Sequence, residues 1–514
     1  MPIRAPGALP KRELYFVLSA LMLGMLLAAL NATIVSTALP TIVNDLHGAN
    51  HLSWVVVAYL LAQTVSTPLW GKLGDLYGRK IFFIAAIVIF LVGSMLCGFA
   101  TNMMMLILFR ALQGLGGGLM VGAQAVITDV VPPRERGKYS GRRVRSGGGL
   151  GPLLGGFIVE YWSWRCIFFV NVPFGIVALV VTASALPNAG ERKQHVIDYA
   201  GIVVLTLASS ALILFTSLGG SSFAWMSPQS IALLVGGVVL TVAFVMIERR
   251  SREPVLPPSL FANRVFSSAS AIGFVVGFAM FGAMTFLPLY FQDVHGASPT
   301  NSGLRLLPMM VGLFSASIIV GQLVVRGWRY RAFPIAGTAV MTIGIGLLGT
   351  IGVTTSTLIT GIYMLILGVG IGLVMQILIT AVQNAVNPAD VGAATAGSTF
   401  FRSIGGSFGT AVFGAIYTNE LPRQLAASVK SSGFTGVLPT ASQWTPSELR
   451  TLPATAIYVI THLISSSISH IYLLAIPVGV VALLLSLTLP EVKLRTSLHP
   501  VADEVPMSIA DPVP

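Results

Sequence analysis

The residues of this chain best suited to chemistry are charged and amide side chains placed beside or inside long apolar segments. Asp75 and Arg79 stand four residues apart in the charged, glycine-rich stretch of residues 71–80, which separates two apolar segments. Arg110 and Gln113 lie inside a later apolar segment. Charged groups are costly in hydrocarbon, so those found there pair with one another or serve a binding site. The expected chemistry is therefore ion pairing and reversible binding.

Motifs for bond-making chemistry are missing from the sequence. There is no G-x-S-x-G elbow, no phosphate-binding loop and no metal-ligand spacing of His, Cys, Asp and Glu. The closest approach to a metal cluster is Asp45, His47 and His51, which have no further ligand nearby. We expect these three residues to form a solvated polar loop. The sequence thus predicts no enzyme, no metal site and no cofactor.

The composition excludes a soluble globular protein. Only 9% of the 514 residues are charged, 54% are hydrophobic and the mean hydropathy is +0.84, whereas a soluble protein carries about 25% charged residues. The apolar segments are long and continuous, which favours helices over barrel strands. The net charge of +12 comes largely from Lys and Arg in short loops, so it indicates membrane topology and not a nucleic-acid partner.

Fourteen segments approach the roughly 20 apolar residues that a membrane-spanning helix needs. The predicted fold is therefore an all-α polytopic membrane protein with fourteen transmembrane helices. The predicted spans are residues 14–39, 52–70, 81–100, 104–131, 147–162, 166–186, 199–218, 231–247, 267–290, 306–325, 333–353, 358–381, 393–417 and 471–489.

Loop charges predict the orientation. Loops after the second, fourth, sixth, eighth and tenth spans carry Lys and Arg, and those after the first, third, seventh and eleventh carry none. Under the positive-inside rule both terminal tails, residues 1–13 and 491–514, face the cytoplasm in a cell membrane. Residues 419–470 then form a long outer loop. We expect their apolar part, residues 452–463, to be an interfacial or hairpin helix.

The two ends of the chain resemble each other at an offset of 250–255 residues. The stretch at Gly71 matches that at Gly321, and Gly114-Leu-Gly-Gly-Gly-Leu matches Gly368-Val-Gly-Ile-Gly-Leu. The repeat predicts two six-helix halves, residues 14–187 and 261–490, with two inserted helices in residues 188–260. Repeated halves around a central site are typical of secondary transporters.

The stretch over residues 71–80 resembles the G-x-L-a-D-r-x-G-R-K signature of the major facilitator superfamily, and Arg110, Gln113 and Gly114 resemble its next motif. The resemblance implies a charge latch that holds the two halves together on the cytoplasmic side. Its candidate members are Gly71, Asp75, Gly78, Arg79, Lys80 and Asp129.

The stretch over residues 147–156 resembles the antiporter motif of exporters in this superfamily, carried by Gly147, Gly151, Pro152, Gly155 and Gly156. Further landmarks at residues 30–40, 163–175 and 303–309 resemble the fourteen-span drug:proton antiporter family. That resemblance implies a monomer that exports amphipathic, often cationic compounds across the bilayer, driven by inward proton flow. The candidate coupling or substrate-cavity residues are Asn31, Gln63, Arg110, Gln113, Gln124 and Arg402.

Two departures from the family leave alternatives open. Asn31 stands where many members carry Asp, and an amide cannot bind and release a proton at physiological pH. Arg142, Arg143 and Arg145 stand where the fifth span should begin with apolar residues. The alternatives are an exporter of an endogenous lipid or antibiotic, and a scaffold or sensor that no longer transports.

Overall fold

A computed structural model of the chain describes residues 24, 31, 34–35, 38–39, 41–46, 52–77, 79–130, 150–185, 198–219, 223–251, 254–387, 390–432 and 454–491. Apart from one isolated bridge between Gly219 and Phe223, the regular structure in these ranges is helical. The predicted all-α class is confirmed.

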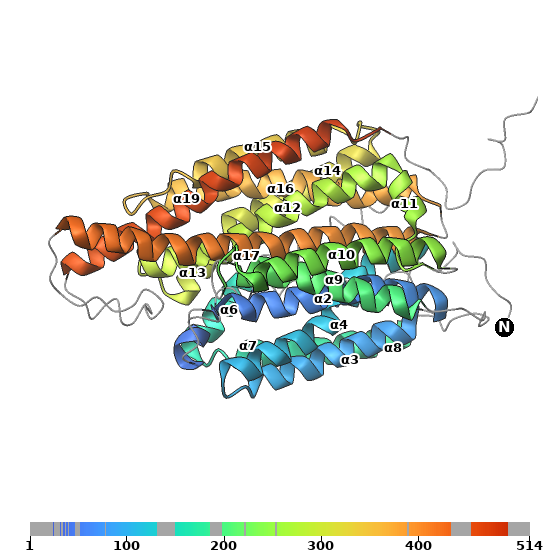
Figure 1. Cartoon of the computed structure of the whole chain (residues 1–514), viewed down its shortest axis with the longest axis horizontal. Coiled ribbons are helices and arrows are strands. Elements are labelled where there is room, and N and C mark those ends of the chain that lie inside the picture. The colour runs from blue at the N-terminus through green and yellow to red at the C-terminus, as the bar shows by residue number, and fades with distance from the viewer. Residues whose placement is uncertain are drawn as a thin grey trace, which may run out of the picture.

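The described helices run side by side as an elongated bundle (Figure 1). The first part of the chain supplies α2 (Leu52–Tyr77), α3 (Arg79–Gly98), α4 (Met103–Val130), α6 (Leu150–Tyr161), α7 (Cys166–Phe169) and α8 (Asn171–Ala185). The middle supplies α9 (Tyr199–Leu218), α10 (Pro228–Arg250) and the short α11 (Pro258–Ala262). The last part supplies α12 (Arg264–Leu289), the π-helix η2 (Tyr290–Val294), α13 (Pro299–Arg305), α14 (Leu307–Val325), α15 (Ala332–Leu348), α16 (Thr357–Ala385), α17 (Val391–Ser432) and α19 (Ala454–Leu487).

Length and composition of these helices fit a bilayer. Within the described ranges eight helices are long and apolar enough to cross a membrane, and shorter apolar helices cover residues 54–70, 103–118 and 332–348. One face of α10 exposes Val235, Val238, Val239 and Val242. A soluble surface rarely carries such a continuous apolar stripe, whereas lipid covers it without cost.

The stretch over residues 71–80, predicted to lie between the spans 52–70 and 81–100, is mostly helix, so the predicted end of the second span was wrong. Helix α2 continues to Tyr77 and α3 begins at Arg79. Glycine costs only about 1 kcal/mol in a helix interior, which packing can offset, and Gly74 is buried. Gly78, the residue between the two helices, lies outside the described residues.

The predicted boundary of the last span was also wrong. Residues 454–487 form one continuous helix, so the apolar stretch over 452–463 belongs mainly to the start of α19 and is not a separate interfacial or hairpin helix. Helix α17 likewise runs on to Ser432. Buried Ser465 and Ser467 lower the hydropathy just before the predicted start of the last span, although a helix satisfies their backbone groups internally.

Glycine-mediated packing repeats between the first and last parts of the chain. Helix α4 packs on α2 and α3, and α16 packs on α14 and α15. A Cβ atom at Gly114 would overlap the Tyr59 carbonyl oxygen of α2, and one at Gly368 would overlap the Met309 carbonyl oxygen of α14. The other matched glycines behave alike: Gly118 meets α2 and Gly372 meets α14, while Gly116 meets α3 and Gly370 meets α15. The repeat predicted from the sequence is thus present in the packing.

Candidate functional site

Arg110 lies in the first half of α4, about two turns from its N-terminus, with only 1% of its surface exposed. Its Nε donates a hydrogen bond to the Val55 carbonyl oxygen (3.1 Å), and its Nη1 donates to Gln113 Oε1 (2.8 Å). The guanidinium carbon lies 4.2 Å from the centroid of the Tyr59 ring, a cation–π distance. The backbone and an aromatic face of α2 therefore fix the position of a buried cation on α4.

Asn31 and Gln113 complete this polar cluster. Asn31 Oδ1 accepts hydrogen bonds from Arg110 Nη1 and from Gln113 Nε2, both at 3.2 Å. The thiol of Cys97 lies 3.9 Å from Gln113 Oε1. Within the described residues no carboxylate pairs with Arg110. Its positive charge is stabilised instead by two amide oxygens, one backbone carbonyl oxygen and one aromatic ring. We call Asn31, Tyr59, Arg110 and Gln113 the Arg110 cluster.

Among the remaining candidate residues of the substrate cavity, Gln63 and Arg402 have no described hydrogen bond to this cluster. Gln63 is buried on α2, and its backbone carbonyl oxygen accepts a hydrogen bond from Thr67 Oγ1 at 2.7 Å. Arg402 lies on α17 beside Gly277 of α12 and is partly exposed. No described residue forms an ion pair with it. The side chain of Gln124 lies outside the described residues.

Most of the predicted charge latch lies outside the described residues. The side chains of Asp75, Arg79 and Asp129 lie outside the described residues, as do Gly78 and Gly147. Lys80 is partly buried at the start of α3. The latch therefore stays a prediction. The same holds for Gly151 and Pro152, whose surroundings are also outside the described part.

Gly155 and Gly156, at the end of the predicted antiporter motif, are both buried. Gly156 packs directly on α13, because a Cβ there would overlap the Pro299 carbonyl oxygen. One turn later, Glu160 Oε2 accepts a hydrogen bond from the backbone N–H of Thr300 at 3.2 Å. We call this the α6–α13 contact. It joins the two repeated parts of the chain, which also meet where α2 packs on α17. Sequence reasoning did not anticipate the role of Glu160.

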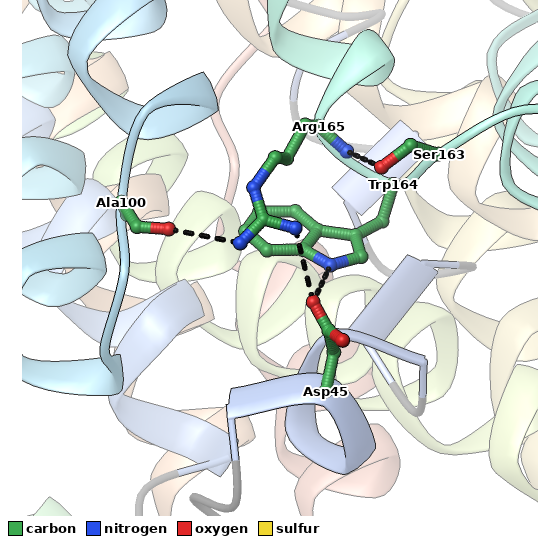
Figure 2. Close-up of polar contacts among 5 residues, drawn as sticks. All are labelled: Asp45, Ala100, Ser163, Trp164 and Arg165. Atoms are coloured by element: carbon green, nitrogen blue, oxygen red, sulfur yellow. Dashed lines mark hydrogen bonds and ion pairs between the residues drawn. The ribbon is translucent and has the colours of Figure 1, made fainter.

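A second polar cluster ties three segments of the first part together (Figure 2). Asp45 Oδ2 accepts from Trp164 Nε1 at 2.7 Å and from Arg165 Nη1 at 3.0 Å. Arg165 Nη2 donates to the Ala100 carbonyl oxygen at 3.2 Å, and its guanidinium carbon lies 4.3 Å from the Trp164 ring centroid. Asp45 is therefore a paired helical residue, and its prediction as part of a solvated loop was wrong. The described residues hold no group of three potential metal ligands.

Replacing Asp45 with alanine should destabilise the protein more than replacing it with asparagine. The Asp45–Arg165 ion pair is half exposed and is worth only about 0–1 kcal/mol. Trp164 is 3% exposed, and leaving its N–H without an acceptor costs about 1–3 kcal/mol. Thermal unfolding of the two purified variants in detergent measures the difference. Equal unfolding temperatures would show that the Trp164 hydrogen bond contributes nothing.

Comparison with known proteins agrees with this architecture. The family model of the Major Facilitator Superfamily matches residues 21–410, more than half of the chain. The chain belongs to the major facilitator superfamily. It is thus a multi-pass membrane protein of a transporter family and not an enzyme.

Similar proteins include named transporters. The chain is 44% identical to an uncharacterised MFS-type transporter of Mycobacterium tuberculosis, over 98% of this chain and 73% of that protein. It is 37% identical to the multidrug transporter protein MdtP of Bacillus subtilis, over 88% of each chain. A bacterial homologue of the human lysosomal transporter Spinster, solved inward-facing and unoccupied, superposes with a TM-score of 0.61 at 17% identity, covering 93% of this chain and 98% of that one. This last likeness concerns the fold alone.

Proposed function

We propose that the chain is a secondary active exporter that moves amphipathic, often cationic compounds out across the cell membrane by alternating access, driven by proton influx. The observation that carries this proposal is how the two repeated parts meet. The α6–α13 contact includes a glycine packed on backbone and one hydrogen bond between Glu160 and Thr300, and no described ion pair crosses it. A contact of this kind can open and reform, as alternating access requires.

The wider organisation follows from the sequence and is part of the same proposal. Fourteen spans form two six-helix halves, residues 14–187 and 261–490, with α9 and α10 as the inserted pair. The basic loops place both termini in the cytoplasm, which makes the α6–α13 contact the outer end of the bundle. The protein works as a monomer and needs no cofactor beyond the proton gradient.

Similarity to a multidrug transporter supports the substrate class. Within the first half, the Arg110 cluster supplies a buried polar group next to aromatic surface, an arrangement suited to orienting a largely apolar compound. The proposed roles of Asn31, Gln63, Arg110, Gln113, Gln124 and Arg402 in binding or coupling rest on this arrangement and on the family resemblance.

Transport by the purified protein in liposomes tests the proposal. Ethidium, a fluorescent amphipathic cation, should move faster when a pH gradient is imposed, and a protonophore should remove the acceleration. Movement that ignores the gradient would contradict proton coupling. Complete absence of transport would contradict the exporter and favour a scaffold or sensor. A pump for an endogenous lipid or antibiotic would respond to the gradient only with that compound.

A further inference from the structure

The structure assigns a proton-binding role to Asp293: we propose that this carboxylate, on the π-helix η2, takes up the transported proton from the outer side and thereby controls the α6–α13 contact. The inference rests on the proposed exporter function and adds to it the residue that replaces the missing carboxylate at position 31. Asn31 cannot titrate, so a proton-driven exporter built on this chain needs an acidic side chain elsewhere.

Asp293 has the surroundings of a group that changes its protonation state. Its Oδ1 atom is fully enclosed and has no hydrogen-bond partner among the described residues. A carboxylate with one oxygen enclosed and unpartnered is costly while charged, and protonation removes that charge and supplies a donor. Two other described acids have enclosed carboxylate oxygens, and both already accept hydrogen bonds from backbone N–H groups: Glu248 from Val255 and Leu256, and Asp198 through its Oδ1 from Gly201. Backbone N–H donors therefore stabilise the charged form of these carboxylates.

The backbone at Asp293 departs from a regular helix. The last turn of this span is a π-helix over Tyr290–Val294, and Gly296, two residues after it, has a left-handed φ of 58°. π-Helical turns inside longer helices occur frequently at functional sites. The Tyr290 hydroxyl fixes one side of this turn by donating to the Gly352 carbonyl oxygen at 2.8 Å.

Chain connectivity links this carboxylate to the outer contact. Five residues separate Asp293 from Pro299, where α13 begins. Pro299 and Thr300 are the residues that Gly156 and Glu160 of α6 touch. A change in how η2 packs when Asp293 gains or loses a proton is therefore transmitted directly to the segment that closes the outer end.

The neighbouring ionisable groups leave Asp293 as the proton acceptor. Tyr417 of α17 faces it and interacts with its charge. Arg305 of α13 lies over the Phe291 ring, 5.4 Å from its centroid. Burial, and then the charge of Arg305, lower the pKa of His295, so this imidazole is neutral at physiological pH.

Two further elements complete the surroundings. Helix α19, which also packs on η2, carries His462 and His470. His462 is exposed and stacks on Tyr458. On α6, the Glu160 carboxylate faces the N-terminus of α13 and is already hydrogen-bonded there.

The proton follows a simple balance in this scheme. It passes from water at the outer side to an Asp293 oxygen, forming one O–H bond, and leaves the same oxygen for water at the inner side after the halves have rearranged. One compound moves outward in the opposite direction. Nothing is oxidised or reduced.

Transport by Asp293→Asn separates coupling from movement. In reconstituted liposomes, the variant should lose the accumulation of ethidium that a pH gradient drives. It should keep counterflow, which is the exchange of external labelled ethidium for internal unlabelled ethidium without a gradient. Asp293→Glu should restore part of the gradient response. The matched control is Glu491→Gln, which removes a carboxylate at an exposed position after α19 and should behave as wild type. Gradient-driven accumulation that persists in Asp293→Asn, or counterflow lost together with it, would overturn the proposal.

A second measurement needs no substrate. Trp162 and Asn301, two exposed residues beside the α6–α13 contact, are each replaced by cysteine, and a spin label is attached to each new thiol. The distance between the labels should change with pH in the wild-type background and become independent of pH with Asp293→Asn. An unchanged pH response in the variant would overturn the role of Asp293 even where wild-type transport is coupled. Wild-type transport that ignores the gradient would instead count against the proposed exporter.

Discussion

Replacing Arg110 with methionine should reduce transport by roughly tenfold or more, because even one lost hydrogen bond to a charged group is worth about 1.5–3 kcal/mol. The guanidinium group holds Asn31, Gln113 and the α2 backbone together through three hydrogen bonds. Methionine fills a similar volume and makes none of them. The rate of ethidium movement in liposomes measures the loss.

The same substitution should leave folding nearly intact. No described carboxylate pairs with Arg110, so burying its charge is itself costly, and an apolar replacement of similar size is often neutral or stabilising. An unchanged thermal unfolding temperature together with lost transport would show that the Arg110 cation serves function and not stability. Arg326→Met, at an exposed position after α14, is the matched control and should transport normally. Normal transport by Arg110→Met would reduce the Arg110 cluster to a packing feature.

Replacing Gly368 with alanine should destabilise the protein by about 1–3 kcal/mol, the usual cost of overpacking. The added methyl group would overlap the Met309 carbonyl oxygen, and backbone cannot move aside as a flexible side chain does. Gly114→Ala should have the same effect in the first half, where the methyl group meets the Tyr59 carbonyl oxygen. Thermal unfolding in detergent measures both.

The control for these substitutions is Gly236→Ala on α10, where a Cβ has open space around it. This variant should be as stable as wild type or up to about 1 kcal/mol more stable, since alanine is the better helix former. If Gly368→Ala proves as harmless as Gly236→Ala, close helix packing through the repeated glycines is not what holds each half together.

The sequence predicted the helical class and the glycine repeat because these depend on local composition and spacing. Hydropathy identifies a span whatever its neighbours are, and a glycine pattern at a fixed offset indicates the same packing twice. The proximity of Arg110 and Gln113 was also foreseeable, as they lie three residues apart on one helix face.

What the sequence could not predict depends on contacts between distant segments. Asp45 meets Arg165 across 120 residues, and Glu160 meets Thr300 across 140. A charged stretch such as residues 71–77 resembles a turn in hydropathy although it continues a helix, because the cost of its glycines is offset by packing that only the fold provides. Asp293 lies just beyond the predicted span 267–290, and the helix continues to Val294 as a π-helical turn, which has no hydropathy signature.

The most direct test of alternating access is a reversible lock on the α6–α13 contact. Glu160 and Thr300 are each replaced by cysteine in a background where Cys97 and Cys166, the cysteines of the native chain, are alanine. A short thiol crosslinker cleavable by reductant then bridges the new pair in the liposome-reconstituted protein. We predict that crosslinking stops ethidium transport and that reduction restores it, while each single-cysteine variant is unaffected by the reagent. Undiminished transport by the fully crosslinked protein would contradict the account.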